Sequence, residues 1–227
     1  MTSFALKIIA CVCMFIDHSG YAIFGKFSYF NYIGRLAFPI FAFQITEGYT
    51  HTKNLKKYIV RLLIFAIISQ IPFALFLSKL TNEYSFNIFF TLLLGLFSII
   101  GYDKLSNFIL KFVPVVIFAT IGQIANVDYG AYGVILIFVF YLFRNNKLTT
   151  AFGFLFAVFI NHGRNILVNY LEHGFNPNYI DKQIAIGVCV LASLFPILLY
   201  NKKQGKKLKY FLYIFYPAHL LLLYYLM

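Results

Sequence analysis

The sequence predicts an all-α fold, a polytopic transmembrane helix bundle that forms a single domain over residues 1–227. Three observations lead to this prediction. The chain is 61% hydrophobic and only 11% charged, whereas soluble domains are about 45–50% apolar and about 25% charged. Apolar runs long enough to cross a bilayer, which takes about 20 residues, recur along the whole chain. The connections between these runs are too short to hold a second, soluble domain.

About nine apolar runs are expected to span the membrane, within limits of eight and ten. They lie at 4–24, 31–50, 57–78, 86–101, 112–125, 131–143, 149–161, 183–200 and 208–226. The fifth to seventh are short and suit helices buried within protein. The long connection 162–182 contains the turn signal Asn176-Pro177-Asn178, and its first half can extend the seventh span. The first run lacks a basic n-region and a small-residue cleavage site, so we expect no cleavable signal peptide.

Membrane topology explains the formal net charge of +12 better than nucleic-acid binding does. Thirteen of the 19 Lys and Arg residues, Arg61 among them, lie in the connections that follow even-numbered spans or in the first five residues of the next span. Because Lys and Arg collect in cytoplasmic loops, this bias places the amino terminus in the cytoplasm of a bacterial-type inner membrane and the carboxyl terminus outside. The basic runs at Lys53, Lys56 and Lys57 and at 202–209 are expected to contact anionic lipids. The alternative is that they receive the phosphates of a soluble donor.

The first span carries Lys7, Asp17 and His18 inside an apolar run. A charge at the centre of a span costs roughly 2.5–3.5 kcal/mol, so such residues usually serve a function. Lys7 and His18 are eleven positions apart and share one helix face, with about 16 Å of rise between them. His18 is a candidate general base, because histidine exchanges a proton near neutral pH. Asp17 faces another direction and would orient a group on a second helix. The alternative is an interfacial polar pair.

The second span contains Arg35 near its start and Glu47 near its end. Arg35 would counter Asp17 or bind an anion through its planar fork, and the alternative is a snorkelling interfacial cation. Glu47 is a candidate substrate ligand, and the alternative is a pair with Lys53 or Lys56. Pro39 predicts a kink between them.

Several further polar side chains interrupt or flank the later spans, and most fall in the predicted outer half. They are Gln70, Asp128, His162, Arg164 and His219. This grouping favours a polar pocket open to the outside, in which Asp128 would position an amine or pair with Arg164. The alternative for Asp128 is a helix cap before Ala131. No histidine pair has the H-x3-H spacing of a zinc site, so no metal is expected.

Several sequence blocks together resemble the TraX family of multi-spanning proteins, which are associated with conjugation. The blocks are IDH-x-G from Ile16, GRLAFP-x-FAF from Gly34, Glu47-Gly48 and DYGAYG from Asp128, and the resemblance covers nearly the whole chain. The family's namesake acetylates the amino terminus of pilin. The resemblance therefore implies an acetyltransferase with acetyl-CoA as co-substrate. The acceptor would be a pilin-like peptide amine or, as alternatives, a sugar or lipid-linked glycan.

A second, wider resemblance is to membrane acyltransferases of the acyltransferase-3 type. Those enzymes carry an Arg, ten residues and a His in their first helix, and Lys7 and His18 have that spacing with Lys in place of Arg. This likeness implies that His18 is the acyl-transfer residue.

We therefore expect an acetyltransferase in which His18 is the general base, oriented by Asp17 or Asp128. Arg35 or Arg164 would stabilise the oxyanion. Lys7 and the basic loop Lys53–Lys57 would bind acetyl-CoA. The candidate substrate ligands are Glu47, Gln70, His162, Arg164 and His219. The alternatives are a transporter or flippase-like protein, since broken helices with buried charges also occur there, and a non-catalytic assembly factor of a conjugation or secretion system.

Overall fold

A computed structural model of the chain describes residues 1–206 and 210–227, and the secondary-structure elements of this part are all helices, with no β-strand among them. Its helices are α1 Ser3–Phe24, α2 Tyr29–Gly34, α3 Ala37–His51, α4 Leu55–Ser78, α5 Ile88–Lys104, the short 3-10 helix η1 Leu110–Phe112, α6 Val113–Ile124, α7 Gly130–Leu142, α8 Lys147–His173, α9 Pro177–Ala192, α10 Leu194–Leu198 and α11 Phe211–Leu226. The all-α prediction is confirmed. Lys207 and Lys209 of the predicted basic run lie outside the described residues.

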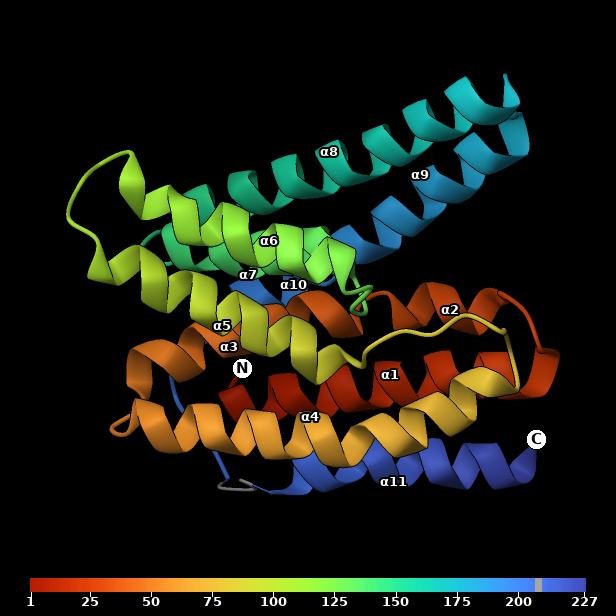
Figure 1. Cartoon of the computed structure of the whole chain (residues 1–227), viewed down its shortest axis with the longest axis horizontal. Coiled ribbons are helices and arrows are strands. Elements are labelled where there is room, and N and C mark those ends of the chain that lie inside the picture. Colours follow the sequence, from red (N-terminus) through yellow and green to blue (C-terminus); the bar gives the residue numbers. More distant parts are fainter. Residues whose placement is uncertain (207–209) are drawn as a thin grey trace.

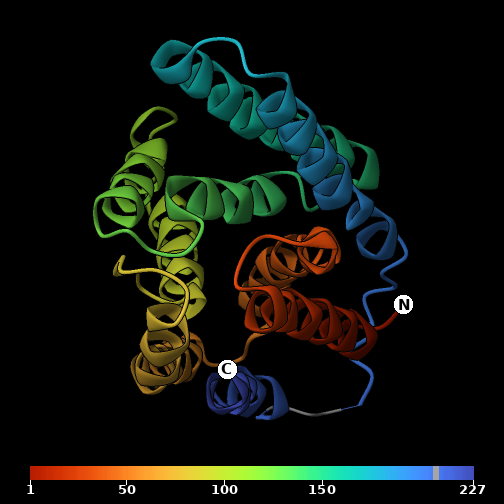
Figure 2. The ribbon, with the colours of Figure 1, turned by 90° about the vertical axis from the view of Figure 1, so that its right-hand side faces the viewer.

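Six helices form a closed ring, which positions the candidate site (Figures 1 and 2). Each helix packs against the next in the order α1, α3, α7, α5, α4, α11 and back to α1. Apolar side chains line most of the interior, and fully buried ones include Leu6, Ile40, Leu62, Leu96 and Leu220. Polar groups inside the ring are therefore exceptions that call for an explanation.

Helix α1 matches the first predicted span almost residue for residue. The Thr2 hydroxyl accepts a hydrogen bond from the Ala5 N–H at 3.2 Å and caps its start, and Gly25, at φ 62°, ends it in the left-handed conformation. The Ser3 and Phe4 N–H groups donate to the carbonyls of Lys203 and Gln204. The start of α1 thereby fixes the connection between α10 and α11 beside the ring.

The second predicted span is two helices, α2 and α3, that meet at Arg35 and Leu36. Pro39 explains the break, because a proline ring clashes with the carbonyl four residues earlier, here that of Arg35, and supplies no N–H to it. The kink expected from Pro39 is thus a short interruption of the helix, about one turn before Pro39 in the sequence. This interruption leaves Arg35 at the junction of the two helices.

Helices α8 and α9 form a long hairpin outside the ring (Figure 1). Helix α8 runs on to His173, so the first half of the predicted connection does extend the seventh span. The turn is followed by α9, whose start is capped by the Asn176 side chain and has Pro177 in its first turn. The eighth predicted span is divided into α9 and α10 at Ser193.

Four stretches are long and apolar enough to cross a membrane: α1, α4, α8 and the stretch Pro177–Leu198. Further apolar helices, at Leu110–Ile124, Gly130–Leu142 and Phe211–Leu226, are shorter. The chain thus has the composition of a membrane protein. The number of nine spans and the cytoplasmic amino terminus stay predictions.

Candidate functional site

Two cavities lie inside the ring, one after the other along α1. The histidine cavity, of about 490 Å³, is lined by Asp17, His18, Arg35, Asp128 and Tyr129 among others. The basic cavity, of about 610 Å³, is lined by Lys7, Gln44, Glu47, Arg61 and Tyr213 among others, with Lys202 and Lys206 from the connection that the start of α1 holds. The first span therefore supplies polar groups to both cavities, with Lys7 in one and His18 in the other.

His18 on α1 is hydrogen-bonded to His219 on α11, although 201 positions separate them in the chain. The Nδ1 atom of His18 lies 2.7 Å from Nε2 of His219, and the two rings are stacked at 5.0 Å. Nδ1 of His219 lies 2.8 Å from the carbonyl oxygen of Phe215, one turn back on the same helix. His219 is buried, with 4% of its surface exposed, whereas His18 faces the cavity.

Asp17 and Arg35 form an ion pair on the wall of the histidine cavity, with 2.8 Å between Oδ1 and Nη2. The Asn31 amide also donates to Asp17, at 3.1 Å, and Arg35 donates through Nε to the carbonyl of Asn31. A Cβ atom at Gly34 would lie 2.2 Å from the Asp17 carboxylate. Only glycine therefore allows α2 to approach α1 closely enough for this network. The prediction that Arg35 counters Asp17 is confirmed.

Asp128 enters the histidine cavity from the connection between α6 and α7. Its backbone N–H donates to Phe86 at 2.8 Å, and the Thr91 hydroxyl donates to its carbonyl. The next residue, Tyr129, has a left-handed backbone with φ 64° and stacks on Phe38 at 3.8 Å. Asp128 does not cap α7, because the residue at the cap position is Tyr129, which makes no side-chain cap hydrogen bond.

The carboxyl group of Asp128 faces both Arg35 and Asp17. Burial raises the pKa of Asp128 to about 7, although the positive charge of Arg35 acts in the opposite direction. The expected partner Arg164 is instead exposed on α8, outside both cavities. The cation that faces Asp128 is therefore Arg35.

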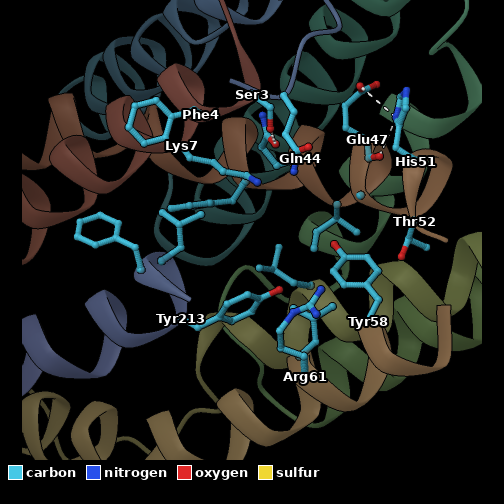
Figure 3. Close-up of a pocket in the computed structure, with 18 of the residues that line it drawn as sticks. Ser3, Phe4, Lys7, Gln44, Glu47, His51, Thr52, Tyr58, Arg61 and Tyr213 are labelled. Carbon is cyan, nitrogen blue, oxygen red and sulfur yellow. Dashed lines mark hydrogen bonds and ion pairs between the residues drawn. The ribbon is translucent and has the colours of Figure 1, made fainter. Parts of the chain in front are cut away.

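Arg61 of α4 lies between two tyrosine rings at the basic cavity (Figure 3). Its guanidinium carbon is 5.4 Å from the ring centres of both Tyr58 and Tyr213. Lys7 projects from α1 into the same space. Among the described residues, neither Arg61 nor Lys7 belongs to an ion pair. Two like charges that face one cavity repel each other, and an anionic ligand would relieve this repulsion.

Three polar atoms at this cavity have no hydrogen-bond partner within the described part of the chain. They are Nε of Arg61, Nε2 of Gln44 and Oε2 of Glu47. Gln44 uses its oxygen to accept from the Ser3 hydroxyl at 2.7 Å, which leaves its amide hydrogens free. Buried polar atoms are nearly always hydrogen-bonded, so the atoms of Arg61 and Gln44 that lack a partner indicate a place for a ligand or ordered water, whereas Oε2 of Glu47 lies in an ion pair with His51.

A shared apolar wall separates the two cavities. Met14, Phe41, Ile88 and Tyr216 line both of them. The wall thus combines side chains of α1, α3, α5 and α11. The Tyr216 ring also lies 6.4 Å from that of His18. The cavities are therefore neighbours across one layer of side chains, and His18 stands next to that layer.

Other predicted site residues lie away from the two cavities. Lys53, Lys56 and Lys57 are exposed and line neither cavity. Gln70 accepts from the Asn87 amide at 2.8 Å and fixes the start of α5. His162 is hydrogen-bonded to Gln183 at 2.8 Å, between α8 and α9.

Glu47 does line the basic cavity, but its pairing was predicted wrongly. Its carboxylate lies 3.7 Å from His51, one turn on, rather than against Lys53 or Lys56. Among the described residues, no group of three His, Cys, Asp or Glu is arranged to hold a metal ion.

Sequence reasoning missed the role of Arg61, together with Tyr58 and Tyr213. A signal was present, because Arg61 lies five residues inside the apolar run that starts at 57, as unusual a place for a charge as Asp17 in the first run. It was counted as a topology residue instead. The tyrosines that flank it carry no such signal, since 18 tyrosines are spread over the chain.

Comparison with known proteins identifies the family of the chain. The TraX protein family matches residues 3–227. The chain is also 27% identical, over 240 residues, to the "Probable fimbrial assembly protein FimC, serogroup H1" of Dichelobacter nodosus, an alignment that covers 98% of this chain and 94% of that protein. No solved structure matches it. The resemblance indicated by the sequence blocks is confirmed, and the chain belongs to the TraX family.

Proposed function

We propose that this protein is a membrane-embedded acetyltransferase. It would move an acetyl group from cytoplasmic acetyl-CoA to an amine or hydroxyl of an acceptor that enters from the other side, such as the amino terminus of a pilin-like peptide. The basic cavity would hold the donor and the histidine cavity the acceptor. Under the charge-based topology, the basic cavity opens toward the cytoplasm, where acetyl-CoA is made.

One observation carries this proposal: a cavity with unpaired cationic donors adjoins a cavity with a histidine base across a single layer of side chains. Arg61 lines this cavity and is held between Tyr58 and Tyr213, and a guanidinium in such a place suits a phosphate group. Lys7 adds a second charge to the same cavity. A thioester placed at the wall would lie beside His18.

The reaction needs one proton transfer in each direction. An acceptor amine that binds as an ammonium group first loses one proton to the solvent. His18 then accepts a proton from the acceptor as its neutral nitrogen, or a hydroxyl oxygen, attacks the thioester carbonyl. The tetrahedral intermediate then breaks its C–S bond, and the proton returns from His18 to the departing thiolate. The products are the acetylated acceptor and free CoA. Arg35 lines the same cavity as His18 and is the cation suited to the oxyanion, while Arg164 is too exposed for this role.

The histidine cavity is lined by two carboxyl groups, Asp17 and Asp128, and by two cations, Arg35 and the exposed Lys26. Asp17 is neutralised by Arg35, which leaves Asp128 as an additional carboxyl group in the histidine cavity. A carboxylate at that place favours an acceptor amine over a neutral hydroxyl. This supports an amine such as a peptide amino terminus as the better acceptor.

A non-catalytic role in pilus assembly is the second candidate, and the likeness to a probable fimbrial assembly protein favours it. In that case the cavities would bind no acetyl-CoA, and partner binding alone would be the function. Thermal unfolding in detergent with and without CoA separates the two, because a ligand that binds only the folded protein raises its apparent stability.

Turnover is then measured with purified protein in nanodiscs, acetyl-CoA and a short peptide with a free amino terminus. Release of the CoA thiol and the mass of the peptide are followed together. Peptide-dependent CoA release and a peptide with one added acetyl group would support the proposal. If CoA does not stabilise the protein and no acetyl group is transferred, the proposal is overturned in favour of the assembly role.

A further inference from the structure

His219 contacts the base rather than the histidine cavity, and its own hydrogen bonds determine what His18 can do. A backbone carbonyl only accepts, so Nδ1 of His219 must donate to the oxygen of Phe215. In a neutral imidazole the other nitrogen then carries a lone pair. Nε2 of His219 is therefore an acceptor, and the hydrogen in its 2.7 Å bond to Nδ1 of His18 belongs to His18.

This chain of two bonds fixes the tautomer of His18. With the proton on Nδ1, the lone pair lies on Nε2, at the opposite side of the ring. Within residues 1–206 and 210–227, no protein group hydrogen-bonds to Nε2 of His18. Since His18 lines the histidine cavity and His219 does not, Nε2 is the nitrogen available to an acceptor.

We propose that His219 is a positioning residue that holds His18 in the Nδ1–H tautomer and shares the positive charge when His18 takes a proton at Nε2. The catalytic part of this inference rests on the proposed function, whereas the tautomer of His18 follows from the hydrogen bonds alone. A base is usually oriented by a third group, most often a carboxylate. Here a neutral histidine and a helix carbonyl take that place.

The surroundings keep the pair in one arrangement. His219 stacks on Phe215 at 4.9 Å and meets Tyr216 edge-on at 5.7 Å. On the other side, the Phe76 ring packs edge-on against His18 at 5.4 Å. A carboxylate in place of His219 would add a buried charge, whereas a neutral ring costs less within a membrane. The predicted role of His219 as a direct substrate ligand is thereby replaced by one that acts through His18.

The test compares His219→Gln with His219→Leu. Glutamine can place an oxygen where Nε2 lies and accept from His18, whereas leucine fills similar space but accepts nothing. Nitrogen-15 NMR of histidine-labelled protein reads the tautomer of His18 directly, with His18→Gln used to assign its signal and His173→Leu as a control far from the cavities. We expect Nδ1–H in the wild type and in His219→Gln, and its loss in His219→Leu.

Transfer kinetics provide the second readout. His219→Leu should lower kcat on the order of 10²-fold, the scale of general-base catalysis, with the KM for acetyl-CoA unchanged, and His219→Gln should recover most of the loss. An Nε2–H tautomer in the wild type would overturn the inference, as would equal losses in both folded variants. Absence of transfer in the wild type would instead contradict the proposed function and leave the tautomer result to decide the positioning role.

Discussion

Asp17 and Arg35 are joined by an ion pair of 2.8 Å that ties α1 to the junction of α2 and α3. The side chains are only 14% and 21% exposed, so solvent screens the pair weakly. The ion pair holds the junction of α2 and α3, where Pro39 causes a break, against α1, the helix that carries His18. The stability of this part of the bundle and the shape of the histidine cavity therefore depend on the same contact.

Removal of one partner should be worse than removal of both. Asp17→Asn or Arg35→Gln alone leaves a largely buried charge uncompensated, which costs about 3 kcal/mol, the low end of the range for buried ion pairs. The double variant should regain part of that loss. Unfolding of the three variants in detergent gives the coupling energy by a double-mutant cycle, and additive losses would show that the two side chains do not stabilise each other.

Gly34→Ala should destabilise the protein although it adds a single methyl group. The new Cβ would lie 2.2 Å from the Asp17 carboxylate, so the ion pair or the helix must shift, at a cost of about 1–3 kcal/mol. The matched control is Gly163→Ala in α8, where no atom lies within 4 Å and alanine favours the helix. A stability of Gly34→Ala equal to that of Gly163→Ala would argue against the close approach of α2 and α1.

Arg61→Gln should weaken CoA binding by about 10- to 100-fold, the value of a lost charge-assisted hydrogen bond. Its thermal stabilisation by CoA should fall accordingly, with Lys104→Gln as an exposed control that removes the same charge. Lys57→Gln tests the sequence-based prediction that the basic loop binds acetyl-CoA, since Lys57 lies outside the cavity. A loss in Lys57→Gln larger than in Arg61→Gln would move the donor site to the exposed loop.

Binding of a cationic acceptor should tighten as the pH rises from about 5.5 to 7.5. Burial raises the pKa of Asp128 to about 7, so its carboxyl group is mostly neutral at the lower value and mostly charged at the higher. A peptide α-amino group, with a pKa of about 7.7–8.0, stays mostly protonated across this range. Calorimetry of a short peptide should show this rise in the wild type and not in Asp128→Asn. An unchanged pH dependence in the variant would exclude Asp128 as the anchor.

Much of the fold could be predicted because apolar runs report helices directly. The runs at 4–24, 57–78 and 131–143 became α1, α4 and α7 with shifts of one or two residues. The errors lie where tertiary packing decides. The division of the eighth span at Ser193 and the pairing of His162 with Gln183 depend on neighbours that periodicity does not identify.

The candidate site, like the fold, could be predicted from the sequence only in part. Charges inside apolar runs pointed to Asp17, His18 and Arg35, and these three share one cavity. The same rule, that a charge inside an apolar run usually serves a function, also applies to Arg61. Because Arg61 lies close to a basic loop, it was interpreted as part of the charge bias that sets the topology. The contact between His18 and His219 was beyond prediction, because only the closure of α11 onto α1 brings the two rings together.

The most direct test of the account is the kcat for acetyl transfer by His18→Ala, compared with Ser19→Ala, a neighbour on α1 that lines neither cavity. With His18 as the general base, we predict that His18→Ala keeps its thermal stabilisation by CoA and loses on the order of 10²- to 10⁴-fold in kcat, while Ser19→Ala stays near the wild type. Full turnover by a folded His18→Ala protein would contradict it.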